Sequence, residues 1–115
     1  MIKIYHNPRC STSRKGCAIV TGIDEPYEII NYMKEPLSTD EIKDLINKLG
    51  IKPVELVRIK EEIWKENYKD KKLTDSQIIE AMHLHPNLIQ RPIIVKGDKA
   101  VIGRPPELIS ELLEK

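Results

Sequence analysis

The sequence predicts one α/β domain in which a β-α-β segment, a helical block and a β-β-α segment follow one another along 115 residues. Three observations support this prediction. Short apolar runs of strand length stand near both ends of the chain, helix-start signals fill the middle, and the length fits a single domain. A chain of this size can bury a core without disulfides or metals. Because Phe is absent and aromatic residues make up only 4%, Ile, Leu and Val must build that core.

The first third of the chain is expected to fold as a strand, a helix and a second strand. Apolar and polar residues alternate over residues 2–5, which is typical of a strand. A loop and a helix then follow, with Cys10 at the turn into the helix, and Gly22 is a plausible stop for it. The run YEIINY, at residues 27–32, is the predicted second strand.

Two well-marked helix starts define the middle of the chain. Ser38 with Glu41, and Thr74 with Gln77, have the spacing of a capping box, in which the first side chain and the fourth satisfy each other's backbone N–H groups. Apolar residues at helical spacing follow both boxes, and Gly50 ends the first helix. We therefore expect a helical insertion at about residues 37–87 within a single domain of residues 1–115.

The last quarter is expected to form a β-hairpin and a helix. The apolar run at residues 93–95 and the run at residues 100–102 flank Gly97-Asp98, a strong turn signal. Pro105 and Pro106 then precede a final helix with one apolar face. The residues on that face are Leu108, Ile109, Leu112 and Leu113.

Charge and hydropathy exclude several classes of function. The net charge is +1, so there is no general basic field for nucleic acid or anionic lipid. No apolar run approaches the ~18 residues that a membrane-spanning helix needs. The opening MIKIYH lacks the apolar stretch of a signal peptide, so we expect a cytoplasmic protein. In that compartment two cysteines are expected to be reactive or reduced, not bridged.

The segment HNPRCSTSRKGC contains both cysteines and points to a nucleophilic thiol at Cys10. A thiolate is stabilised at a helix N-terminus and by cationic neighbours. Cys10 has the predicted helix start on one side and Arg9, Arg14 and His6 nearby in sequence, with hydroxyl donors at residues 11–13. The same features attract an oxyanion, so this segment suits a tetrahedral oxyanion that is attacked by sulfur.

Spacing argues against four other uses of these cysteines. A tyrosine phosphatase loop needs arginine at the position of Gly16, and a dithiol redox centre needs cysteine at the position of Ser13. Zinc sites usually show closer cysteine pairs. On one helix Cys10 and Cys17 would be about 10 Å apart, beyond the reach of a disulfide. Cys17 is most simply a small core residue, and a resolving thiol remains the alternative.

Four spaced motifs carry a resemblance to a known family. HNPRCSTSR, ELVRIKE, HPNLIQRPIIV and AVIGRPPE resemble, in this order, the signatures of the glutaredoxin-linked arsenate reductases. The same superfamily includes the Spx-type transcriptional regulators. The similarity runs over nearly the whole chain. It implies an α/β, thioredoxin-like fold with the helical insertion between its N-terminal β-α-β and C-terminal β-β-α parts.

The resemblance also implies roles for eight residues. Arginine presents a planar fork that suits tetrahedral oxyanions better than lysine does, and three of the motifs contain such an arginine. The implied site residues are the catalytic Cys10; Arg58, Arg91 and Arg104 for the oxyanion; His6, Ser13 and Arg14 in the environment of the thiolate; and Pro92 as the cis-proline of thioredoxin-like folds.

The resemblance implies reduction of arsenate to arsenite through a covalent Cys10–arsenic adduct. Glutathione would be the co-substrate and glutaredoxin the thiol partner of a monomer, with no metal, bound cofactor, nucleic acid or membrane involved. Two alternatives stay open. An Spx-type regulator would bind RNA polymerase, although this chain lacks the C-x-x-C switch that such proteins often carry. A related thiol oxidoreductase with another substrate would need the same residues. Arg9 and Cys17 have no role in the family pattern.

Overall fold

The computed structural model describes residues 1–104 and 107–113 in two compact units. The first unit combines Met1–Glu35 with Arg91–Lys115, and the second consists of Pro36–Gln90. The helical insertion that the sequence predicts, at about residues 37–87, falls within the second unit. Each unit has its own secondary structure and core.

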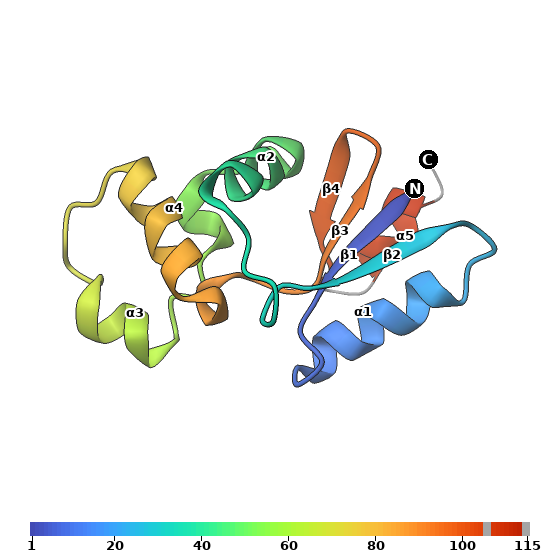
Figure 1. Ribbon diagram of the computed structural model, residues 1–115, viewed down its shortest axis with the longest axis horizontal. Coiled ribbons are helices and arrows are strands. Elements are labelled where there is room, and N and C mark those ends of the chain that lie inside the picture. Colours follow the sequence, from blue (N-terminus) through green and yellow to red (C-terminus); the bar gives the residue numbers. More distant parts are fainter. Residues whose placement is uncertain (105–106, 114–115) are drawn as a thin grey trace. The chain divides into compact units, whose positions relative to one another are not determined.

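The first unit is built on one mixed, four-stranded sheet (Figure 1). Its spatial order is β2-β1-β3-β4; β1 pairs parallel to β2, and the other two pairings are antiparallel. The predicted α/β class is therefore confirmed. The strands are β1 (Ile2–His6), β2 (Tyr27–Asn31), β3 (Ile93–Lys96) and β4 (Lys99–Ile102).

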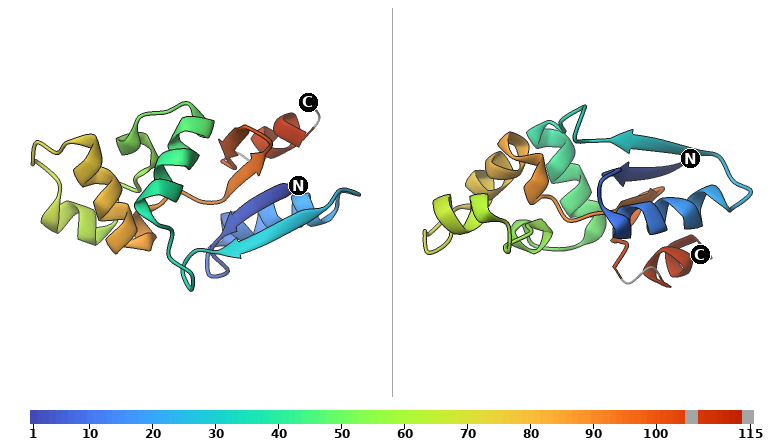
Figure 2. Two further views of the ribbon diagram at one scale, coloured as in Figure 1. Left: turned by 45° about the horizontal axis from the view of Figure 1, so that its top comes forward. Right: turned by 90° about the horizontal axis from the view of Figure 1, so that it is seen from below.

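Two helices, α1 (Ser11–Thr21) and α5 (Glu107–Leu113), pack against one face of this sheet (Figure 2). Alternation along β1 and β3 directs one set of isoleucines to that face, where the two helices cover them. The resulting core cluster consists of Ile2, Ile4, Val20, Ile94, Ile109, Leu112 and Leu113. As the composition requires, it contains only aliphatic side chains.

The ends of these elements follow the predicted signals closely. Cys10 is the N-cap of α1, and Gly22 is its C-cap. The hairpin turns at Gly97-Asp98, where Gly97 has a φ of +65°, a conformation that favours glycine. Both predictions are confirmed. The expected helix start at Pro105-Pro106 lies outside the described residues, and α5 runs from Glu107.

The second unit is helical within the residues described. Both predicted capping boxes are present, since Ser38 and Thr74 each accept from the backbone N–H three residues on and receive the reciprocal side-chain bond. Gly50 ends the first helix with a φ of +67°. The elements are α2 (Thr39–Leu49), the 3-10 turn η1 (Pro53–Leu56), α3 (Glu62–Asn67), α4 (Asp75–Leu84) and the 3-10 turn η2 (Pro86–Leu88).

Polar contacts connect the parts of the second unit. The His83 ring lies 2.7 Å, Nδ1 to carbonyl oxygen, from Leu37, and this contact joins α4 to the residue just before α2. An antiparallel bridge pairs Val57 with Ile89, and the Arg58 N–H donates to the Leu88 carbonyl at 2.7 Å. The segments that follow η1 and η2 are thereby held together by backbone contacts.

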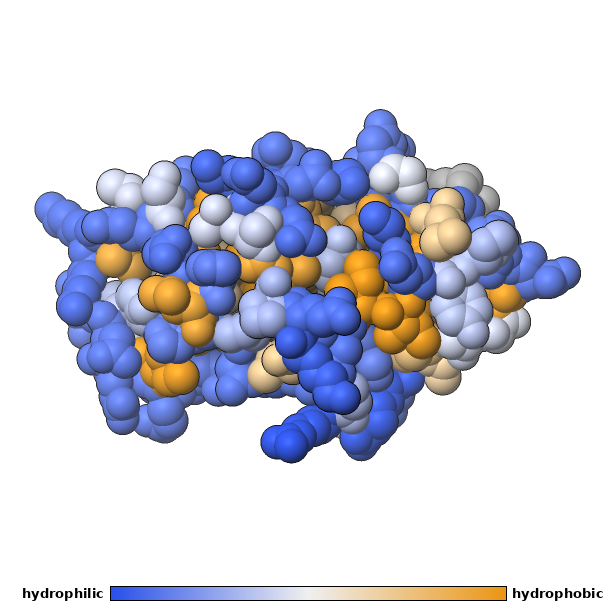
Figure 3. Space-filling view, viewed as in Figure 1, coloured by the Kyte–Doolittle hydropathy of each residue, from blue (hydrophilic) through white to orange (hydrophobic). Residues whose placement is uncertain are grey.

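The face shown in Figure 3 is mostly hydrophilic, with apolar side chains visible between the hydrophilic ones. Among the residues described, no helix combines the length and the apolar character needed to cross a membrane. The large apolar side chains that remain exposed are Met1, Tyr27, Ile29, Val54, Ile59 and Leu84.

Candidate active site

One edge of the sheet gathers the chemically active residues of the first unit. The register pairs the ends of β1 and β2, the end of β1 with the start of β3, and the start of β3 with the end of β4. The chain therefore enters or leaves all four strands at this edge. The residues placed there are Cys10 after β1, Tyr32 after β2, Arg91 before β3 and Arg104 after β4.

The loop between β1 and α1 is held by short polar bonds. The Asn7 side chain accepts from the Arg9 N–H at 3.0 Å, and the Asn7 carbonyl accepts from the Cys10 N–H at 3.0 Å. The Asn7 N–H in turn donates to the buried Ser13 hydroxyl at 2.9 Å. These bonds fix the turn that presents Cys10 to the helix start.

His6, at the end of β1, and Ser13 and Arg14, on α1, hold this loop. The His6 Nδ1 and the Ser13 hydroxyl oxygen are 2.7 Å apart, so the hydroxyl serves both His6 and the backbone of Asn7. The Arg14 guanidinium donates to the Pro8 carbonyl at 3.0 Å. The Ser13 and Arg14 side chains therefore contact the loop directly, and the His6 side chain contacts Ser13.

Cys10 is half-buried at the N-terminus of α1, with extended backbone angles. Burial alone would raise the pKa of its thiol. The backbone N–H of Ser13, the Arg91 guanidinium and the backbone N–H of Thr12 outweigh burial, and the net pKa is lowered. The helix start and one arginine thus stabilise the thiolate, in the way that the sequence pattern suggests.

A second arginine reaches the same thiol. Arg104 Nη2 lies 4.0 Å from the Cys10 sulfur and donates to the Thr12 hydroxyl at 3.4 Å. Arg104 is exposed, whereas Arg91 is only 8% exposed. The thiol therefore has one buried and one exposed guanidinium beside it, and both offer the donors that an oxyanion requires.

The Arg91–Pro92 peptide bond is cis, and the Pro92 ring lies against two glycines. A Cβ added at Gly16, on α1, would be 2.6 Å from the Pro92 Cγ. One added at Gly103 would be 2.9 Å from the same atom and 2.7 Å from the Cδ1 of Ile109. Only glycine allows α1 and the end of β4 to approach the ring this closely.

His6 is neutral near neutral pH. Burial and the nearby Arg14 lower its pKa, and the hydrogen bond with Ser13 only partly opposes them. His6 is therefore not a source of positive charge for Cys10 at neutral pH. The cations that contact the Cys10 thiol are arginines.

Cys17 lies elsewhere. It is a free thiol, half-buried against the apolar cluster between α1 and the sheet, and burial raises its pKa. It has the environment of a packing residue, with a thiol less ionised than an ordinary one.

Arg58, from the expected site, and Arg9, beside Cys10 in sequence, have local contacts of their own. Arg58 belongs to the second unit, where its Nη1 lies 3.4 Å from a carboxylate oxygen of Glu61. Arg9 is exposed, and its backbone, not its guanidinium, contributes to the Asn7 turn.

Within residues 1–104 and 107–113, no three His, Cys, Asp or Glu side chains are grouped so as to hold a metal ion.

The sequence predicted Tyr32 only as the last residue of a strand. It directly follows β2 and is fully buried. It also lies near enough to Arg91 and Cys10 for both groups to influence the pKa of its phenol. The sequence signal that could have marked Tyr32 as a site residue is its position: it is a tyrosine at the end of a predicted strand, at the same edge of the sheet as the thiol.

Comparison with known proteins identifies relatives over nearly the whole chain. The sequence model of the ArsC family matches residues 5–112. An arsenate reductase of Haemophilus influenzae is 40% identical over 114 residues, which cover 96% of this chain and 97% of that protein. The uncharacterized protein YfgD of Escherichia coli is also 40% identical over 114 residues, 97% of this chain and 96% of its own length.

A solved structure extends the similarity to the fold. The arsenate reductase from Vibrio cholerae superposes with a TM-score of 0.90 at 41% identity, covering 96% of this chain and 95% of that one. The thioredoxin-like fold expected from the sequence is confirmed by this match.

Proposed function

Because this chain belongs to the ArsC family, we propose that it reduces arsenate to arsenite, with Cys10 as the nucleophile. The observation that carries the proposal is the environment of the Cys10 sulfur, which has a lowered pKa and the Arg104 guanidinium 4.0 Å away. A thiolate beside preorganised cations is suited to attack a tetrahedral oxyanion.

In the proposed first step, Arg91 and Arg104 bind arsenate oxygens and orient arsenic toward Cys10. The thiolate attacks arsenic, a protonated oxygen leaves as water, and a Cys10–arsenic(V) bond forms. Arg58 is proposed as a third oxyanion ligand on the family motif ELVRIKE alone. His6, Ser13 and Arg14 hold the loop that presents the thiolate.

The proposed second step takes electrons from outside the chain. A glutathione thiol attacks the adduct, and glutaredoxin resolves the product. Over the cycle two thiols lose two electrons in forming a disulfide, arsenic(V) becomes arsenic(III), and one oxygen of arsenate leaves as water. Two observations support an external donor. Cys17 has a raised pKa, and its helical spacing from Cys10 is too long for a disulfide. The cytoplasm, where glutathione keeps thiols reduced, is the proposed compartment.

Arsenite production from arsenate with glutathione and glutaredoxin tests the proposal. We expect turnover by the wild type and by Cys17→Ser, and none by Cys10→Ser. Arg58→Ala and Arg91→Ala should both lower turnover. Absence of turnover in folded wild type would reject arsenate as the substrate. Loss of turnover in Cys17→Ser alone would reject the external donor and assign the resolving role to Cys17.

A further inference from the structure

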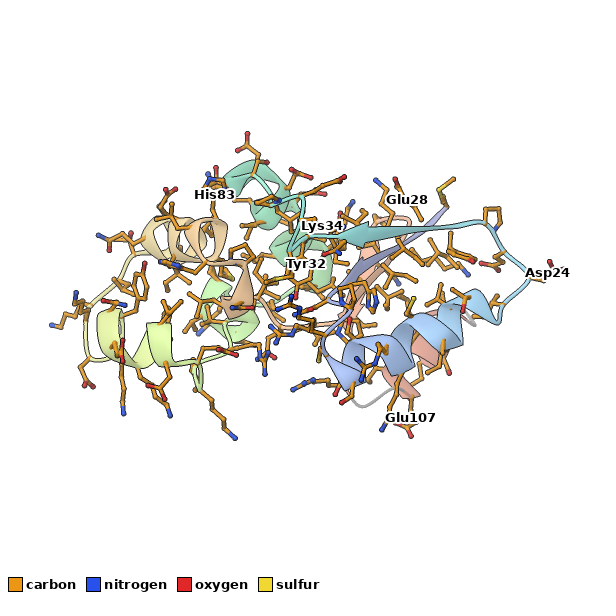
Figure 4. The ribbon with its side chains drawn as sticks, turned by 60° about the horizontal axis from the view of Figure 1, so that its bottom comes forward. Asp24, Glu28, Tyr32, Lys34, His83 and Glu107 are labelled. Carbon is orange, nitrogen blue, oxygen red and sulfur yellow. The ribbon has the colours of Figure 1, made fainter. Side chains whose placement is uncertain are left out.

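Tyr32 occupies a position that the proposed mechanism does not use. It is the first residue after β2, and β2 ends beside β1, where Asn31 pairs with His6. Figure 4 shows Tyr32 at the point where the chain leaves β2, just before the turn that contains Lys34. The loop that carries Cys10 begins at the neighbouring end of β1. Tyr32 and Cys10 therefore arise from adjacent, parallel strand ends.

The phenol is buried without a well-formed hydrogen bond. Tyr32 has an exposed fraction of 0%, and its hydroxyl oxygen has no hydrogen-bond partner among residues 1–104 and 107–113. A buried polar group left without a partner costs about 1–3 kcal/mol of stability. The protein with tyrosine at this position is therefore less stable than one with phenylalanine, unless the hydroxyl binds a ligand. The Arg91 guanidinium lies near enough to act on the phenol as a hydrogen-bond donor, but its effect on the phenol is smaller than that of burial.

The phenol lies near two groups of the candidate site. The Arg91 guanidinium and the Cys10 thiol both act on its ionisation. The hydroxyl therefore lies close to the two groups between which the oxyanion is proposed to bind. Burial raises the pKa of Tyr32 to about 12, against smaller opposing effects of Arg91. The phenol is consequently a protonated donor, not an anion, at any physiological pH.

We propose that the Tyr32 hydroxyl donates a hydrogen bond to an oxygen of the oxyanion bound beside Cys10, as a neutral donor alongside the Arg91 and Arg104 guanidiniums. This role rests on the proposed function and adds a binding residue to it. A neutral donor complements the arginines, because it can donate to a lone pair of the protonated oxygen of a monoprotonated oxyanion without adding charge to a buried site.

Equilibrium binding of arsenate to Cys10→Ser protein, measured calorimetrically at pH 7.5, tests the proposal without covalent chemistry. Adding Tyr32→Phe should weaken binding about ten- to a hundredfold, the usual loss for a hydrogen bond to a charged group. The matched control is Tyr27→Phe, the same change on the exposed start of β2, which should leave the Kd unchanged. Equal affinity in Tyr32→Phe and its parent would overturn the proposal.

A second measurement separates this role from a positioning role. In Tyr32→Phe with Cys10 intact, the pH profile of Cys10 alkylation should match that of the wild type, since the phenol is not among the groups that lower the Cys10 pKa. A shift of the profile to higher pH would mean that Tyr32 acts by holding Arg91, and would reject direct donation.

The two proposals fail in different ways. If wild type binds arsenate but produces no arsenite, the reductase function is rejected while the binding comparison still decides the role of Tyr32. If Cys10→Ser protein binds neither arsenate, phosphate nor sulfate at millimolar concentration, the oxyanion site itself is rejected and the role of Tyr32 with it.

Discussion

The Arg104 guanidinium lies 4.0 Å from the Cys10 sulfur, although 94 residues separate the two in the chain. The sheet creates this contact, because β4 ends at the edge where β1 ends. Arg91 reaches the same thiol from the start of β3. The two arginines differ in burial and in their effect on the thiol, and this difference can be measured.

Arg91→Ala should raise the pKa of Cys10 more than Arg104→Ala does. Arg91 is buried and is among the groups that lower the Cys10 pKa, whereas Arg104 is exposed to solvent screening. A higher pKa moves the alkylation profile of Cys10 to higher pH. Iodoacetamide rates measured between pH 5 and pH 10 check this order. Arg9→Ala, which removes an exposed guanidinium from the same loop, is the control and should leave the profile in place. Equal shifts in Arg91→Ala and Arg104→Ala would contradict the assignment.

Ser13→Ala should lower stability more than it changes the Cys10 pKa. The hydroxyl of Ser13 contacts His6 and the Asn7 N–H, so its removal leaves buried polar groups unpaired, at a cost of about 1–3 kcal/mol. The Ser13 backbone N–H, which acts on Cys10, remains. Urea unfolding and the alkylation profile measure the two effects, with the exposed Ser11→Ala as control. A profile shift as large as that of Arg91→Ala would show that the hydroxyl itself stabilises the thiolate.

Cys10 should react before Cys17 at neutral pH. The pKa of Cys10 is lowered, and burial raises that of Cys17. Both shifts make the thiolate fraction larger at Cys10 than at Cys17. Brief treatment with iodoacetamide at pH 7, followed by peptide mass spectrometry, should find the label at Cys10. Comparable labelling of Cys17 in the folded protein would contradict its placement against the core.

Gly16→Ala should destabilise the protein, although alanine is the better helix former. The gain in helix propensity is about 1 kcal/mol, but the new Cβ would lie 2.6 Å from the Pro92 ring, and relieving such overpacking costs about 1–3 kcal/mol. Gly22→Ala is the matched control, because its Cβ would meet no atom closer than 3.4 Å. Thermal unfolding compares the two. A Gly16→Ala protein as stable as wild type would mean that α1 shifts easily away from Pro92.

Alkaline pH should destabilise the wild type more than Tyr32→Phe. The Tyr32 pKa rises from about 10 in the unfolded chain to about 12 in the folded protein. Between these values the folded protein keeps a proton that the unfolded chain has lost, so stability falls as the pH rises. At pH 11 the difference amounts to about 1.4 kcal/mol. Urea unfolding of both proteins at pH 8 and pH 11 measures it. Parallel losses in the two would mean that Tyr32 ionises equally in both states.

Local patterns predicted most of the elements. Capping boxes at Ser38 and Thr74, the stop at Gly50 and the turn at Gly97 depend on bonds or backbone angles within a few residues, so the sequence contains all the information they need. The thiolate site at Cys10 was predictable for the same reason, since its helix start is local. These are the features that a reader of the sequence could state without a relative.

Contacts between distant segments were not predictable in this way. No spacing rule links Arg104 to Cys10 or sets Gly16 against Pro92, because both contacts depend on the order of strands in the sheet. Family motifs supplied the arginines, but not which of them is buried. Nor did they indicate that the Ser13 hydroxyl turns toward the loop, or that the Tyr32 phenol is buried at this edge.

The strand order also has a consequence for synthesis of the chain. In the sheet, β1 lies between β2 and β3. From His6 at the end of β1 to Ile93 at the start of β3 the chain advances 87 residues, and β4 follows β3. The second unit, by contrast, is one continuous stretch from Pro36 to Gln90. On the ribosome that stretch emerges whole while the sheet still lacks half its strands. Arg104 emerges last of the groups around the thiol, so a partly synthesised chain carries Cys10 without the complete set of cations that contacts it in the folded protein.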